Sequence, residues 1–74
     1  MSDARQTLDQ YFLEMRWRCL SLAADLDRIE RADGGKKLIA SDPRLAQLRN
    51  ALRIVQDSKA NRAEQVQMIF SEER

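Results

Sequence analysis

The chain has 74 residues, of which 43% are hydrophobic and 34% charged, with a formal net charge of +1. This composition is typical of a folded helical domain and excludes a disordered chain. The near-neutral charge leaves no overall field that would recruit nucleic acid or a membrane. A chain this short forms at most one domain, whose core supplies only about 3–5 kcal/mol. We therefore expect a single helical domain over residues 1–74, supported by tight packing or by self-association.

The scarcity of cysteine and the lack of histidine exclude disulfide cross-links and argue against a metal site. Cys19 is the only cysteine and there is no histidine, so a disulfide within the chain is impossible and a zinc site is not expected. No stretch approaches the ~20 apolar residues of a membrane span, and the first residues lack the basic-then-apolar order of a signal peptide. We expect a cytoplasmic protein without a membrane segment, a metal or a cofactor.

The first half of the chain predicts one long helix, from about residue 3 to residue 33. Its apolar residues follow the alternating spacing of four and three that places side chains on one stripe of a helix. This stripe consists of Leu8, Phe12, Met15, Cys19, Leu22, Leu26 and Ile29. The helix starts either at Ser2 or at Thr7, whose partner in a capping box would be Gln10. Gly34 can take the left-handed conformation that ends a helix.

The same helix carries a second apolar stripe on the opposite side. It consists of Leu13, Trp17, Leu20 and Ala24, with polar residues between the two stripes. An ordinary surface helix has one apolar face, so a helix with two must be covered twice. This pattern predicts a partner beyond the rest of the chain.

The second half predicts a connector followed by two shorter helices. The connector spans residues 34–41, and Asp42 and Pro43 then give the N-cap and first position of a helix over about 43–57. The apolar stripe of this helix is Leu45, Leu48, Leu52 and Val55. Extending that stripe would turn Lys59 and Arg62 inward, and Asn61 with Glu64 is a possible capping pair. We expect a break between Asp57 and Asn61 and a third helix over about 61–72. The alternative is one continuous helix with Lys59 extended to solvent.

These elements predict an all-α fold in which the long first helix packs antiparallel against the two shorter ones. The result is a helical hairpin or three-helix arrangement. The exposed remainder of the first helix would then pair with a second copy to give a dimeric bundle, for which two-fold symmetry is the default.

Catalytic chemistry finds little support in the sequence. Without histidine the commonest general base is missing, and no base is available to activate Cys19, which we expect in the apolar core. Gly34 and Gly35 are too few for a phosphate-binding loop and are better explained as a helix end. We expect no catalytic residues.

The charges are distributed unevenly along the chain. Residues 1–33 hold five basic and seven acidic side chains, whereas residues 36–62 hold seven basic and two acidic ones. A basic segment of this kind can bind phosphate backbones, and the residues that would do so are Lys36, Lys37, Arg49 and Arg53. We favour the other explanation, electrostatic pairing with the acidic first helix, because Arg49 and Arg53 share a side of their helix whereas Arg44 points elsewhere. No aromatic residue is interleaved with these charges, so a stacking platform for single-stranded nucleic acid is absent.

Trp17 is the residue with the strongest functional implication. Tryptophan is enriched at interface hot spots because it buries a large area with few rotatable bonds. The structural alternative is that Trp17 is buried beneath the third helix or a loop. We expect Leu13, Trp17, Leu20 and Ala24 to form an interface. The sequence thus predicts a self-associating protein–protein interaction or regulatory module, with nucleic-acid binding as the second hypothesis.

Overall fold

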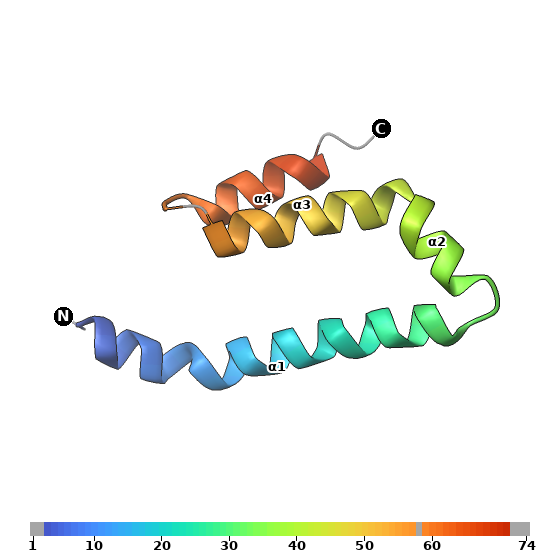
Figure 1. The fold of residues 1–74 in the computed structure, drawn as a ribbon. Coiled ribbons are helices and arrows are strands. Elements are labelled where there is room, and N and C mark those ends of the chain that lie inside the picture. Colours follow the sequence, from blue (N-terminus) through green and yellow to red (C-terminus); the bar gives the residue numbers. More distant parts are fainter. Residues whose placement is uncertain (1–2, 58, 72–74) are drawn as a thin grey trace. The chain divides into compact units, whose positions relative to one another are not determined.

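The computed structural model describes residues 3–57 and 59–71, and over these residues the chain is all-helical, as predicted. The described part contains α1 (Ala4–Arg31), α2 (Gly35–Ser41), α3 (Pro43–Asp57) and α4 (Arg62–Ser71) (Figure 1). The chain divides into two compact units, Met1–Lys36 and Lys37–Arg74. The first unit holds α1 and the second holds α3 and α4.

Asp3 is the N-cap of α1. Its side chain accepts a hydrogen bond from the backbone N–H of Gln6 at 2.9 Å, and its own N–H donates to the Gln6 side chain at 3.2 Å. This reciprocal pair is a capping box, which satisfies two otherwise unpaired N–H groups. The predicted start at Thr7 is therefore wrong, and the Thr7 hydroxyl donates to the carbonyl of Asp3 inside the helix. Ser2, the other predicted start, lies outside the described residues.

Gly34 and Gly35 form the turn that follows α1. The helix ends at Arg31, two residues before the predicted boundary, and the C-cap Ala32 is extended. Gly34 has a φ of 79°, the left-handed conformation expected of it. Gly35 is buried, and a Cβ atom there would overlap the carbonyl oxygen of Ile29. The two glycines thus have different roles: Gly34 allows the left-handed backbone, and Gly35 leaves room for the Ile29 carbonyl.

The segment 34–41, predicted as a plain connector, contains the short helix α2. Its apolar pattern is too short to show a helical period, which explains the error. The Ser41 hydroxyl donates to the Lys37 carbonyl at 2.9 Å, and the N–H of Asp42 donates to the Leu38 carbonyl at 2.8 Å. These bonds lie in the last turn of α2, immediately before α3.

Asp42 is the N-cap of α3, as the sequence predicts, and Pro43 is the first helical residue. The Asp42 carboxylate accepts from the backbone N–H of Arg44 at 2.8 Å and from its guanidinium at 3.0 Å. These hydrogen bonds, the side-chain bond foremost, and the charge of Arg44 lower the pKa of the Asp42 carboxyl below its ordinary value of 3.8.

The predicted break between the last two helices is confirmed. α3 ends at Asp57 and α4 begins at Arg62. Asn61 has a φ of 57°, a left-handed conformation that asparagine adopts more readily than most residues. The Arg62 guanidinium donates to the carbonyl of Val55, in the last turn of α3, at 3.1 Å. The capping bond from Asn61 to Glu64 does not occur among the described residues.

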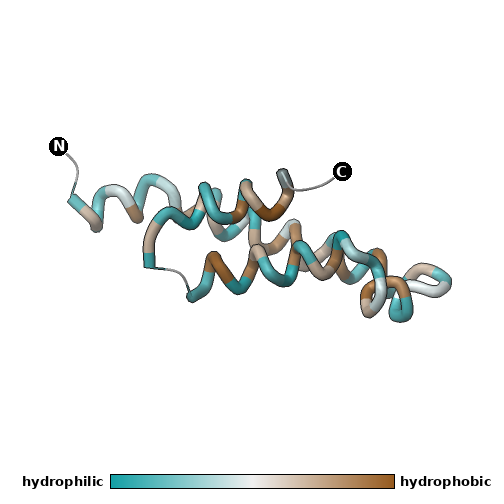
Figure 2. Tube along the Cα trace, turned by 90° about the horizontal axis from the view of Figure 1, so that it is seen from above, coloured by the Kyte–Doolittle hydropathy of each residue, from teal (hydrophilic) through white to brown (hydrophobic). Residues whose placement is uncertain are grey.

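α3 and α4 pack on each other, but not through the whole predicted stripe of α3. Ala51 is the least exposed residue of α3, at 4%, and Ile54 is half-buried. Leu52 and Val55, predicted to face inward, are 40% and 53% exposed. The break therefore turns α4 toward the side of α3 that carries Ile54, next to the predicted stripe. The Kyte–Doolittle colouring in Figure 2 shows hydrophobic and hydrophilic residues alternating along each helix.

α1 is the sole long element of its unit. Within residues 3–36 it is followed by the glycine turn and the first residues of α2, so no second helix covers it there. At 28 residues it is about 42 Å long. The antiparallel packing of α1, the single domain and the dimeric bundle remain predictions.

Candidate functional site

The candidate site is the second apolar stripe of α1, here named the Trp17 face and defined as Leu13, Trp17, Leu20 and Ala24. α1 brings all four onto one side of the helix, within about 60° of arc, because they are spaced by four and three residues. Leu13 is 68% exposed, Trp17 65% and Leu20 51%. Ala24 is half-buried. Trp17 is not buried within its own unit, and burial beneath the predicted third helix, which belongs to the second unit, stays a prediction.

The surface is hollowed next to Trp17. The depression is lined by Trp17, Leu20, Ser21, Ala24, Asp25 and Arg28. Trp17 and Leu20 form its apolar wall, and the small side chains of Ser21 and Ala24 leave the space between them open. Four neighbouring residues around such a space form the hole that receives a side chain from a second helix in knobs-into-holes packing. The Trp17 face therefore has the local relief of a helix-packing surface.

Ion pairs run along the polar strip that borders the Trp17 face. Glu14 and Arg18 are joined at 3.0 Å, and Asp25 and Arg28 at 2.7 Å. All four side chains are exposed, so each pair contributes only a few tenths of a kcal/mol to helix stability. The pairs neutralise this strip locally. A partner that covers the Trp17 face does not have to bury an unpaired charge from these four residues.

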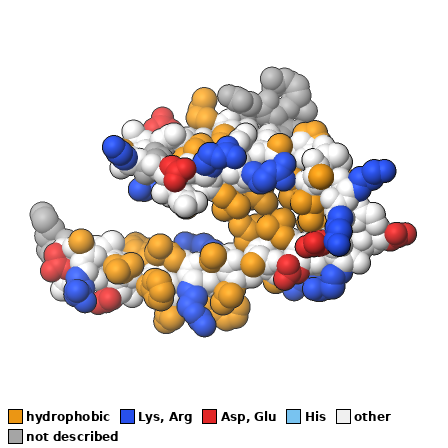
Figure 3. Space-filling view, in the orientation of Figure 1, with side chains coloured by type: hydrophobic (Ala, Val, Ile, Leu, Met, Phe, Trp, Pro, Cys, Tyr) orange, Lys and Arg blue, Asp and Glu red, His pale blue; other side chains and the backbone are white. Residues whose placement is uncertain are grey.

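The opposite stripe of α1 is also open over its first half. Figure 3 shows hydrophobic side chains at the surface along α1, and Leu8, Phe12 and Met15 of this stripe are among the exposed ones. A second shallow depression is lined by Phe12, Met15, Arg16, Cys19 and Leu20. Cys19, which we expected in the core, is exposed. Leu22, Leu26 and Ile29 at the other end of the stripe are half-buried.

The basic residues of the second hypothesis are already engaged in part. Arg49 and Arg53 lie on one side of α3 because they are four residues apart. However, Arg49 donates to the carbonyl of Ile39 at 3.2 Å, and Arg53 donates to the side chain of Asn50 at 2.7 Å. Lys36 belongs to the first unit, whereas Lys37, Arg49 and Arg53 belong to the second. Nothing in these contacts singles out a phosphate-binding site.

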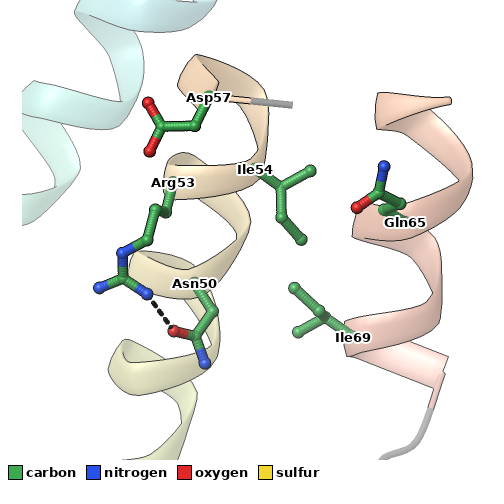
Figure 4. Close-up of a pocket in the computed structure, with 6 residues that line it drawn as sticks. All are labelled: Asn50, Arg53, Ile54, Asp57, Gln65 and Ile69. Atoms are coloured by element: carbon green, nitrogen blue, oxygen red, sulfur yellow. Dashed lines mark hydrogen bonds between the residues drawn. The ribbon is translucent and has the colours of Figure 1, made fainter. Parts of the chain in front are cut away.

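A cleft between α3 and α4 is the other concave feature. It is lined by Asn50, Arg53, Ile54, Asp57, Gln65 and Ile69. Figure 4 shows Ile54 and Ile69 pointing toward one another from the two helices, with the Arg53–Asn50 hydrogen bond on the α3 side. Its interior is formed by two aliphatic side chains, so we regard it as the imperfectly closed packing between α3 and α4.

The spacing of apolar residues predicted the Trp17 face but not the depression beside it. Ser21, Asp25 and Arg28 line the depression because they follow Trp17 at helical intervals of four, four and three. That interval was the signal in the sequence that could have located them.

Among the described residues no three metal-ligating side chains cluster together, and none of the helices is both long and apolar enough to cross a membrane. Neither a family model, nor a curated protein, nor a solved structure matches the chain.

Proposed function

We propose that this protein is a small helical module for protein–protein interaction or regulation, without catalytic activity, which associates with itself through the Trp17 face. The observation that supports the proposal is the exposure of Leu13, Trp17 and Leu20, at 51–68%, on one continuous stripe of α1. Single exposed apolar residues are normal on a protein surface. An ordered row of large ones, with a tryptophan at its centre, is typical of an interface.

The energetics favour covering this stripe. A fully buried side chain of this size contributes about 1.5–3 kcal/mol relative to its exposed state. For a chain whose own core supplies only a few kcal/mol, burying three such side chains is a large gain. A second copy is the simplest partner because one patch then serves both subunits. Two copies of α1, each supported by the rest of its chain, would share a core like that of a four-helix bundle.

The absence of catalytic activity in this proposal rests on the sequence, which has no histidine and no glycine-rich phosphate loop. Glu14 and Asp25, the two acids on the polar strip beside the Trp17 face that form ion pairs, also favour a surface role. Asp25 pairs with Arg28 and Glu14 with Arg18, and all four are solvent-exposed.

Analytical ultracentrifugation at micromolar concentration tests the proposal. We expect a dimer, and a sharp monomer boundary at every concentration would contradict self-association. Trp17→Ala should weaken the dimer by at least about thirtyfold, the equivalent of a 2 kcal/mol hot spot. Its helical circular dichroism should remain, because the side chain is exposed in the subunit.

Met68→Ala is the matched control. Met68 is another large exposed apolar residue, but it lies on α4 in the second unit. We expect this variant to dimerise like the parent chain. Equal weakening by Trp17→Ala and Met68→Ala would mean that general loss of apolar surface, and not the Trp17 face, accounts for the effect.

A further inference from the structure

We infer that two copies pair through α1 in an antiparallel arrangement, with Leu13 of one copy opposite Ala24 of the other and Trp17 opposite Leu20. The inference rests on the proposed function, because it specifies how the Trp17 face meets its own copy. It follows from the chemistry of the full line of residues that shares this side of α1.

The Trp17 face is the centre of a longer heptad line along α1. Continuing the spacing of four and three in both directions gives Gln6, Gln10, Leu13, Trp17, Leu20, Ala24, Asp27 and Arg31. The outer members of this line are exposed. The line reads polar, polar, four apolar residues, polar, polar, so it is the same in chemical character from either end. A line with that symmetry matches itself when one helix is reversed.

Charge decides between the two directions of pairing. In a parallel dimer each residue of the line faces its own copy, so Asp27 would meet Asp27 and Arg31 would meet Arg31. In the antiparallel register Asp27 faces Gln10 of the other copy, and Arg31 faces Gln6. Each charged group then meets a neutral amide able to hydrogen-bond with it, and two like-charged contacts inside the interface are avoided.

The flanking charges do not favour either direction. Asp9 borders the line and comes near Glu14 of the second copy in a parallel pair. In the antiparallel pair it comes near Glu30. Both contacts are between like charges at the solvent-exposed edge, where screening weakens them. The central line therefore determines the direction.

Side-chain size supports the same register. Antiparallel pairing sets the large Leu13 against the small Ala24 and places the two Trp17 rings in successive layers. Parallel pairing would place both rings in one layer. The depression between Trp17, Leu20, Ser21 and Ala24 is then the hole that receives an apolar side chain of the second copy. Large and small residues that alternate across a pair of helices pack without voids.

Site-specific disulfide formation tests the direction in the full-length chain. Cys19→Ser removes the native thiol, which lies on the other stripe of α1. Gln10→Cys and Asp27→Cys are then introduced in separate chains. In the antiparallel register neither chain cross-links alone, and an equimolar mixture gives a covalent Gln10→Cys/Asp27→Cys heterodimer, identified by mass. Arg18→Cys, on the polar strip away from the line, is the control and should not cross-link.

Spin labels at the same cysteines give a second readout that needs no disulfide. Two labels at position 10 should lie about 25 Å apart along the helix axis in the antiparallel pair, against about 8–10 Å in a parallel one. Short distances and self-cross-linking of each variant would overturn the antiparallel register while leaving self-association intact. A dimer that shows neither pattern would overturn it by placing the contact away from this line. A monomer in sedimentation would instead remove the proposed function itself.

Discussion

The side-chain amide of Gln47 on α3 lies 3.3 Å from the carbonyl oxygen of Ile69 on α4 and donates a part-buried hydrogen bond to it. Ile69 is in the last turn of α4, where carbonyl groups have no partner within the helix. Gln47 on α3 therefore provides a hydrogen-bond donor for a carbonyl group in the last turn of α4. It joins two residues 22 positions apart, in a unit where most side-chain hydrogen bonds are local.

Replacing Gln47 tests how much this bond contributes. We expect Gln47→Ala to lower the free energy of unfolding by about 1 kcal/mol, because the Ile69 carbonyl loses its donor in a part-buried position. Urea unfolding followed by circular dichroism measures the change. Gln56→Ala, an exposed position on the same helix, is the control and should be nearly neutral. Equal effects would mean that the Gln47 bond adds nothing beyond helix propensity.

The two glycines after α1 should respond differently to alanine. At Gly34 the only obstacle is the left-handed backbone, since open space surrounds the position, so Gly34→Ala should cost about 1 kcal/mol. At Gly35 the added methyl group would overlap the Ile29 carbonyl, so Gly35→Ala should cost more, about 2–3 kcal/mol. Thermal unfolding of both variants gives the order. Gly34→Asn should be tolerated, and a larger loss at position 34 than at 35 would contradict this account of the turn.

The lowered pKa of Asp42 predicts that the free energy of unfolding decreases at acidic pH. Because the Arg44 guanidinium and N–H lower the pKa of the folded carboxyl, the ionised form stabilises the start of α3. That contribution is fully present above the ordinary value of 3.8 and is lost as the pH falls through the lowered pKa. Asp42→Asn keeps a capping side chain but removes the charge. The stability difference between parent and variant should be constant near neutral pH and shrink in this acid range. A difference unchanged down to the lowest pH would contradict the assignment.

Ala51 is the most buried residue of α3. It is 4% exposed, so Ala51→Leu should destabilise the chain by about 1–3 kcal/mol through overpacking. Ala46→Leu on the same helix is the control, because Ala46 is exposed and leucine is a good helix former. Denaturant midpoints of the two variants should differ clearly. Similar midpoints would show that the position tolerates added volume.

Binding to generic duplex DNA at about 50 mM salt tests the second functional hypothesis. We expect no measurable binding, since Arg49 and Arg53 already donate to Ile39 and Asn50. Fluorescence anisotropy of a labelled duplex is a suitable measurement. Binding that weakens steeply with salt, and that is lost in Arg49→Ala, would restore nucleic acid as a partner.

Strong local signals in the sequence located most helix boundaries. Asp42 and Pro43 define the start of α3 by their own chemistry, and the left-handed Gly34 follows from its lack of a side chain. The start of α1 was harder, because Ser2, Asp3 and Thr7 are all good caps. The choice depends on which one finds its partner three residues later, and Gln6 completes the capping box for Asp3.

Packing direction was not available from the sequence. The spacing of Leu45, Leu48, Leu52 and Val55 shows which side of α3 is apolar, but not which side the next helix covers. That depends on the backbone angles at the break, where Asn61 is left-handed. The same limit applies to the candidate site. Its apolar residues follow from their spacing, whereas the hollow beside Trp17 depends on the relative volumes of its neighbours.

The hydrogen bonds that fix the start of α1 also bear on the order of folding. The capping box and the Thr7 bond join residues three or four apart, and the ion pairs of α1 span the same short distances. Contacts this local cost little loop entropy and form within about a microsecond. The Gln47–Ile69 bond joins residues 22 positions apart and can form only after α4 has formed. During synthesis from the N-terminus, α1 can therefore become helical before the segment that completes the second unit has been made.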